Sequence, residues 1–139
     1  MNRAIVEFVS RQRIGHLATA DMAGNPSVIP ICFVLGKDQT VYTALDSKQK
    51  SVKVSSLKRV TNISENSTVS IVFDVYSEDW EELAYVILFG EASLIEDPVE
   101  QRQAEALLRE KYTQYETFLE HNAPIIRIEV DRSKSWGSI

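Results

Sequence analysis

The clearest pattern along the chain is an alternation of apolar and polar residues over 68–76 (TVSIVFDVY), where Val69, Ile71, Phe73 and Val75 fall on one side. A period of two residues predicts a strand that is buried on one face. Other segments gather apolar, β-branched and aromatic residues between turn-forming residues, which also predicts strands. The six predicted strands are 14–21, 27–35, 40–45, 68–76, 84–96 and 125–130.

Turn-forming residues connect the first three predicted strands. Residues 22–26 (MAGNP) contain Gly, Asn and Pro, which reverse a chain at low cost, and 36–39 (GKDQ) forms a second turn. We therefore expect three antiparallel strands in succession. Gly90 stands inside the strand 84–96, where we expect a bend, a bulge or a close approach of two backbones.

Helical periodicity appears in three places. Residues 2–10 place apolar side chains at the i, i+3, i+4 spacing, and the later part of 47–64 can form a helix that its β-branched residues weaken. Asp97 and Pro98 open the clearest helix as N-cap and first helical residue, with Glu100 placed for a capping box. Its apolar stripe comprises Ala104, Leu107, Leu108, Tyr112 and Tyr115.

These elements predict one α+β domain over residues 1–139, with six strands and two or three helices. Hairpin-linked strands come first, and a helix precedes the last strand, which favours a sheet that curls into a small Greek-key barrel. A chain of this length is too short for two full domains with a cleft between them. A second copy is therefore expected to supply the other wall of an enclosed site.

Composition excludes several classes of protein. The longest apolar run, 28–35, has eight residues, whereas a membrane-spanning helix needs about 20, so we expect no membrane partner. One Cys and two His within a chain cannot build a disulfide framework or a Cys/His zinc site. Cys32 lies inside the apolar run and is predicted to be a buried small hydrophobe. The first residues lack the uninterrupted apolar centre of a secretion signal, so we expect a cytoplasmic protein.

Charge is distributed unevenly along the chain. Residues 1–63 hold nine Lys and Arg against four Asp and Glu, whereas 64–139 hold six against sixteen, and the whole chain carries a formal charge of −5. This acidity argues against nucleic acid as a partner. Within the basic half, 47–64 has five cationic residues and no acid. A compact phosphate fits this segment better than a polymer.

The segment 42–62 carries the candidate chemistry. It offers hydroxyls at Thr43, Ser47 and Ser51, then lysines, then a predicted helix with Arg59 and Asn62. Cationic side chains, hydroxyls and a helix start together can hold a phosphate monoester. A solvated basic face is an equally good interpretation of the composition. The chain has no nucleophile elbow, GxGxxG, Walker loop or HExxH motif.

An ordered series of motifs resembles the pyridoxamine 5'-phosphate oxidase-like flavoprotein superfamily, whose fold is a split β-barrel. The series is VIPICFVL, a turn, YTALDSKQKS, and then LKRVTNISENSTVSIVFD. The resemblance runs from about residue 14 to 94 and continues weakly to the C-terminal strand. It implies a homodimer that binds FMN at two sites in the subunit interface.

The resemblance also implies roles for individual residues. Pro30, Ile31 and Cys32 would lie under the flavin ring, with backbone groups on its pyrimidine edge. Trp80 and Trp136 would cover the ring or shape the substrate pocket, although packing in a core or an interface is the commoner fate of Trp. The phosphate cluster would comprise Thr43, Lys48, Lys50, Ser51, Arg59 and Asn62.

We therefore predict a flavin-dependent oxidoreductase that acts on a small-molecule substrate. The motif DVYSEDW at 74–80 is similar to relatives that use the deazaflavin coenzyme, which is the first alternative cofactor. A split barrel that binds flavin without turnover is the second alternative, and a structural dimer whose basic segment docks on an acidic protein is the third. The C-terminus lacks the Arg-x-His pattern of the true pyridoxamine phosphate oxidases, which argues against vitamin B6 oxidation.

Overall fold

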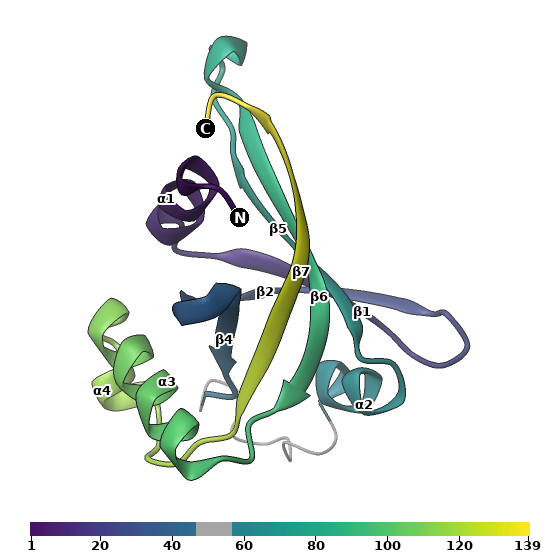
Figure 1. Cartoon of the computed structure of the whole chain (residues 1–139), viewed down its shortest axis with the longest axis vertical. Helices are drawn as coiled ribbons and strands as arrows, with labels where there is room; N and C mark the ends of the chain where they lie inside the picture. Colours follow the sequence, from purple (N-terminus) through teal and green to yellow (C-terminus); the bar gives the residue numbers. More distant parts are fainter. Residues whose placement is uncertain (47–56) are drawn as a thin grey trace.

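A computed structural model describes residues 1–46 and 57–139. Within these residues one antiparallel sheet has seven strands in the order β2-β1-β5-β6-β7-β4-β3. The strands are β1 (Gly15–Ala20), β2 (Pro26–Ile31), β3 (Val34–Leu35), β4 (Thr40–Ala44), β5 (Thr68–Val75), β6 (Ala84–Leu94) and β7 (Ile125–Gly137). In Figure 1 the β1–β2 hairpin crosses β6 and β7 steeply, so the sheet is strongly curled. The predicted α+β class with a curled, barrel-like sheet is confirmed.

The concave face of the sheet carries the main core. The alternate residues predicted from 68–76 point inward, and Val69, Ile71 and Phe73 are buried, but Val75 at the end of the strand is exposed. Aromatic contact between Phe33 and Phe73, with ring centroids 4.6 Å apart, packs the link between β2 and β3 against β5. The largest buried side chains of this core include Leu17, Phe33, Val41, Ile71, Phe73, Val86 and Leu88.

The predicted strand 27–35 is wrong as a single element, because it breaks at Cys32 and Phe33. The Phe33 side chain is buried in the core, and its backbone amide donates to the hydroxyl of Tyr112 instead of to a strand. After this break β3 pairs with β4, and β4 pairs with β7 rather than with β2. The break raises the strand count above six and separates the expected run of three successive strands into two hairpins.

Four α-helices and two short 3-10 helices lie in the described part of the chain, more than the two or three helices predicted. They are α1 (Arg3–Arg11), α2 (Lys58–Glu65), α3 (Pro98–Lys111) and α4 (Tyr115–Phe118), with η1 (Lys37–Gln39) and η4 (Trp80–Glu82). Tyr115 opens its own helix instead of continuing the stripe of α3. None of the helices in this part of the chain has the length and hydropathy that crossing a membrane requires.

Helix α3 begins as predicted but without the capping box. The Asp97 carboxylate accepts from the amide of Val99, and Pro98 takes the first helical position. Glu100 instead accepts hydrogen bonds from the Tyr42 hydroxyl at 2.8 Å and from Nε of Arg127 at 3.0 Å. The carboxylate therefore ties α3 to β4 and β7 rather than closing its own first turn.

Two further features fix the sheet around the site. The register of β6 against β7 shifts at Gly90, where an added Cβ would lie 2.2 Å from the carbonyl oxygen of Glu129. This confirms the expected bulge and close backbone approach. Helices α3 and α4 cover β4, and between them lies a second apolar cluster against which Cys32 packs. Cys32 is half-buried rather than fully buried.

Candidate functional site

The convex face of the sheet gathers residues from five strands. Directly paired residues point to the same side of a sheet, so the register defines this outer face. One row crosses the sheet through Pro30, His16, Val72, Ile87 and Lys134. Asp74, Tyr85 and Trp136 form the next row. An open hollow of about 480 Å³ lies on this face, lined by His16, Val72, Asp74, Tyr85 and Ile87.

The two predicted ring-covering tryptophans occupy different places. Trp136 extends the outer face, half exposed, and stacks on Tyr85 with ring centroids 5.8 Å apart. Trp80 lies in η4 at the tip of the β5–β6 hairpin and is 72% exposed. Figure 1 shows this tip beside the C-terminus, beyond the curled part of the sheet. The structure therefore brings Trp136, but not Trp80, beside the hollow.

The predicted ring platform divides between the two faces of the sheet. Pro30 is exposed on the outer face, whereas the Ile31 side chain is only 5% exposed and packs in the core. Ile31 can therefore offer only its backbone to a ligand on the outer face. The Cys32 carbonyl accepts a hydrogen bond of 2.8 Å from the hydroxyl of Thr43, which is itself buried. Thr43 thus ties the end of β2 to β4.

Arg59 lies in the first turn of α2, at a helix start that no side chain caps. Its Nε atom is buried and has no hydrogen-bond partner among the described residues. Burial lowers the pKa of the guanidinium, and the nearby carboxylate of Asp46 and hydroxyl of Tyr115 partly offset this effect. A buried donor without an acceptor is costly. The site therefore fits an anion that would bind this guanidinium.

Tyr115 connects Asp46 to the end of β2. Its hydroxyl donates to the Asp46 carboxylate at 3.0 Å, and burial, followed by the nearby Cys32 and Asp46, raises the pKa of this phenol. The phenol therefore stays protonated. Four neighbouring residues thus lead from the end of β2 to the start of α2. We call them the polar corner: Cys32, Tyr115, Asp46 and Arg59.

Asn62 anchors α2 and does not point to solvent. Its side chain is fully buried and its Nδ2 donates to the hydroxyl of Thr19 at 2.9 Å. Its Oδ1 has no partner within the described part of the chain. Lys58 makes a further contact of 3.8 Å with Asp21, in the β1–β2 connection. Asn62 is thus placed to position α2 against β1. The other predicted phosphate residues, Lys48, Lys50 and Ser51, lie outside the described residues.

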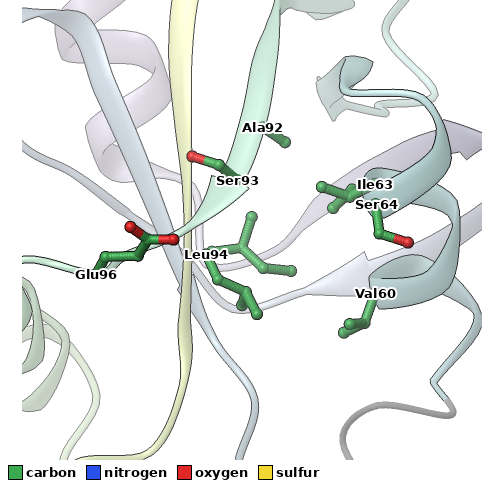
Figure 2. A pocket seen from close by; sticks show the side chains of 8 residues that line it. Val60, Ile63, Ser64, Ala92, Ser93, Leu94 and Glu96 are labelled. Atoms are coloured by element: carbon green, nitrogen blue, oxygen red, sulfur yellow. The ribbon is translucent and has the colours of Figure 1, made fainter.

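A second pocket, of about 220 Å³, lies between α2 and the ends of β6 and β7 (Figure 2). Figure 2 shows Val60, Ile63 and Ser64 on α2 across from Ala92 and Leu94 on the sheet, with Ser93 pointing away from the helix and Glu96 at the edge. None of the residues predicted for the cofactor lines this pocket. Asn62 is not among the residues that line it.

Comparison with models of protein families shows which family the chain belongs to. The family model described as pyridoxamine 5'-phosphate oxidase matches residues 1–137. The chain belongs to the pyridoxamine 5'-phosphate oxidase family. No curated protein matches it. The resemblance inferred from the motif series is therefore confirmed.

Solved structures share the fold of this family member at low sequence identity. A proposed 5-nitroimidazole antibiotic resistance protein of Bacteroides thetaiotaomicron has 18% identity and a TM-score of 0.74, with 96% of this chain and 82% of that one covered. A conserved hypothetical protein of Mycobacterium tuberculosis has 21% identity and a TM-score of 0.75, with 99% and 85% covered. The heme storage protein of Vibrio cholerae has 18% identity and a TM-score of 0.72, with 96% and 92% covered.

Sequence reasoning missed two residues of the polar corner in this family member. Tyr115 fits the packing stripe of the predicted helix, and nothing in the sequence marks Asp46, whose carboxylate lies near the Arg59 guanidinium. The one available signal was the acid immediately before the basic segment, in the motif TALDSK. Such a lone acid is common at the end of a strand, so it did not indicate a site.

Proposed function

We propose that the protein is a homodimeric, FMN-dependent oxidoreductase that acts on a small molecule. The observation that carries the proposal is the buried Nε of Arg59 at the uncapped start of α2, for which residues 1–46 and 57–139 offer no acceptor. A phosphate monoester would supply the missing acceptor and meet the positive end of the helix dipole. Lys48, Lys50 and Ser51 are proposed to complete the phosphate site.

The outer face is proposed to hold the ring and the second subunit. Its hollow is lined by apolar area from Val72, Tyr85 and Ile87 and by the Asp74 carboxylate. Lys134, paired with Ile87, adds a positive charge to the same face. A two-fold axis brings a patch onto its own copy, so a face with apolar area and both charges can complement itself. Pro30 and Trp136 would then flank the ring between the subunits.

The cofactor supplies hydride chemistry, and the chain supplies binding and orientation. This division of labour agrees with the absence of a catalytic triad motif from the sequence. A deazaflavin coenzyme could use the same phosphate site, although its longer acidic tail needs more basic surface. Binding without turnover is the remaining alternative on this fold, and anaerobic reduction of the bound flavin by nicotinamide separates it from the enzyme.

The phosphate assignment is tested by titrating the protein with FMN, with riboflavin and with the deazaflavin coenzyme. Loss of a charge-assisted hydrogen bond costs about 1.5–3 kcal/mol, so Arg59→Gln should weaken FMN binding by about 10- to 150-fold. Riboflavin lacks the phosphate, so its affinity should stay unchanged. Lys37→Gln, at an exposed position in η1, is the matched control. Equal losses for FMN and riboflavin would remove Arg59 from the phosphate site.

The dimer is tested by placing a charge on the outer face. Ile87→Glu should convert the dimer to a monomer in sedimentation experiments, because the carboxylate would be buried against the other subunit. Val99→Glu, on an exposed position of α3, should leave the dimer intact. A monomeric wild-type protein, or a dimer that Ile87→Glu does not affect, would contradict this placement.

One observation favours a second candidate function, heme binding. His16 lines the apolar hollow of the outer face, and a structural neighbour is a heme storage protein. Imidazole is a common axial ligand of heme iron. If heme is the ligand, hemin titration gives a saturable spectral change that His16→Ala abolishes and Arg59→Gln does not. The flavin proposal predicts the opposite pattern of sensitivity for FMN.

A further inference from the structure

Lys111, the last residue of α3, holds its ammonium group against buried aromatic rings. The Nζ atom lies 3.7 Å from the ring centroid of Phe33 and 5.4 Å from that of Tyr112. Phe33 is fully buried, so the Lys111 stem and head group are half-buried on the edge of the core. This environment is unusual for a lysine, whose head group normally reaches water.

A second cation lies beside Lys111, and no carboxylate neutralises the pair among the described residues. The Arg13 guanidinium is 4.7 Å from the ring centroid of Tyr112, and its Nη2 donates to the Lys111 carbonyl at 2.9 Å. The other titratable groups at this position are the Cys32 thiol, on the link between β2 and β3, and the Tyr112 phenol. The corner of Arg13 and Lys111 is therefore positively charged.

This environment disfavours the protonated amine. Burial, followed by repulsion from Arg13, lowers the pKa of Lys111 to about 8, and the weaker influence of Cys32 works in the other direction. Attraction between the ammonium and the ring faces offsets part of the effect. Near pH 8 a large fraction of this amine is the free base, compared with about one molecule in 250 for an ordinary lysine.

We propose that Lys111 is an acylation site that reacts with small acyl phosphates without an enzyme. The free amine attacks the acyl carbon, the bond between that carbon and the phosphate oxygen breaks, and phosphate leaves with the electron pair. The amine gives one proton to water. Arg13 attracts the phosphate group of the donor, which brings the acyl carbon to the amine.

Electrostatics also favour the acylated product. The amide is neutral, so the repulsion between Lys111 and Arg13 disappears, together with the desolvation cost of the half-buried ammonium. The attraction between the ammonium and the ring faces is lost in exchange. An exposed lysine gains neither advantage. This proposal does not depend on a flavin or on a dimer.

The test is incubation of the full chain with acetyl phosphate, followed by measurement of acetylation at each lysine by peptide mass spectrometry. Lys37 and Lys58, both exposed and both away from the proposed dimer face, are internal controls. Near pH 8 we expect Lys111 to react at least about ten-fold faster than the control lysines. This rate ratio is smaller than the ratio of free-base fractions, because a half-buried, less basic amine is the weaker nucleophile. Its rate should level off above about pH 8, while the control rates continue to rise.

Variants of Arg13 distinguish this proposal from the alternative that Lys111 reacts only because it is accessible. Arg13→Gln removes the repulsion, so the plateau should move to higher pH and Lys111 should react more slowly, with Lys37 unchanged. Arg13→Lys keeps the charge and should keep the plateau near its wild-type position. Equal rates at Lys111 and Lys37, or a plateau that neither Arg13 variant changes, would overturn the proposal.

Discussion

Removing the Tyr112 hydroxyl should destabilise the fold more than its size suggests. This oxygen accepts from the Phe33 amide at 3.0 Å and donates to the carbonyl of Phe33 or Arg13, each at 2.9 Å. Tyr112→Phe would leave the Phe33 amide buried without an acceptor. An unsatisfied buried group costs about 1–3 kcal/mol, so with the lost hydrogen bond we expect a decrease of about 2–3 kcal/mol. For a chain of this size that corresponds to roughly 6–12 °C in Tm.

The measurement is urea denaturation of cofactor-free protein, in which the midpoint should fall while the slope stays constant. Tyr76→Phe is the matched control, because Tyr76 is 66% exposed. A decrease below about 0.5 kcal/mol for Tyr112→Phe would mean that Phe33 does not depend on this hydroxyl. The explanation given for the break between β2 and β3 would then be incorrect.

Two further predictions concern the sheet. Gly90→Ala should lower the free energy of unfolding by about 2 kcal/mol or more, because the new Cβ would overlap the carbonyl of Glu129. Thermal denaturation measures this change, and a stability within about 0.5 kcal/mol of the wild type would refute the prediction. For Tyr42, burial and then its hydrogen bond to Glu100 raise the pKa from 10.0 to about 12. The protonated phenol therefore stabilises the fold fully below pH 10.0, and this stability is lost as the pH rises through 12. Across this pH range the free energy of unfolding should fall less steeply for Tyr42→Phe than for the wild type. Identical pH dependences for the two proteins would contradict the assignment.

Local signals made part of the fold predictable. The alternation over 68–76 predicts the burial of one face of β5. Asp97 and Pro98 predict the start of α3, which does not depend on residues far away in the sequence. The break at Phe33 depends instead on Tyr112, 79 positions away. Every residue from 28 to 35 fits a buried strand, so nothing local in VIPICFVL distinguishes a continuous strand from a broken one.

In the candidate site, too, the sequence predicts what depends on neighbouring residues and not what depends on distant ones. Arg59 is identifiable because cationic residues without acids cluster before it in the chain. That Pro30 and Trp136 share a face depends on the strand order β2-β1-β5-β6-β7, which the periodicity of each strand does not encode. The same periodicity explains why the Ile31 side chain turns inward when Pro30 turns outward.

Helices α3 and α4 position the polar corner through a single turn of chain. Tyr112 holds the link between β2 and β3, and Tyr115, three residues later, holds Asp46 at the end of β4. Arg109 fixes this turn by donating to the carbonyls of Tyr115 and Leu119 at 2.7 and 2.8 Å. The geometry between Cys32 and Asp46 therefore depends on a guanidinium that touches neither residue. If the protein binds FMN as proposed, changes at Arg109 should alter the affinity for FMN through the position of this corner rather than through contact.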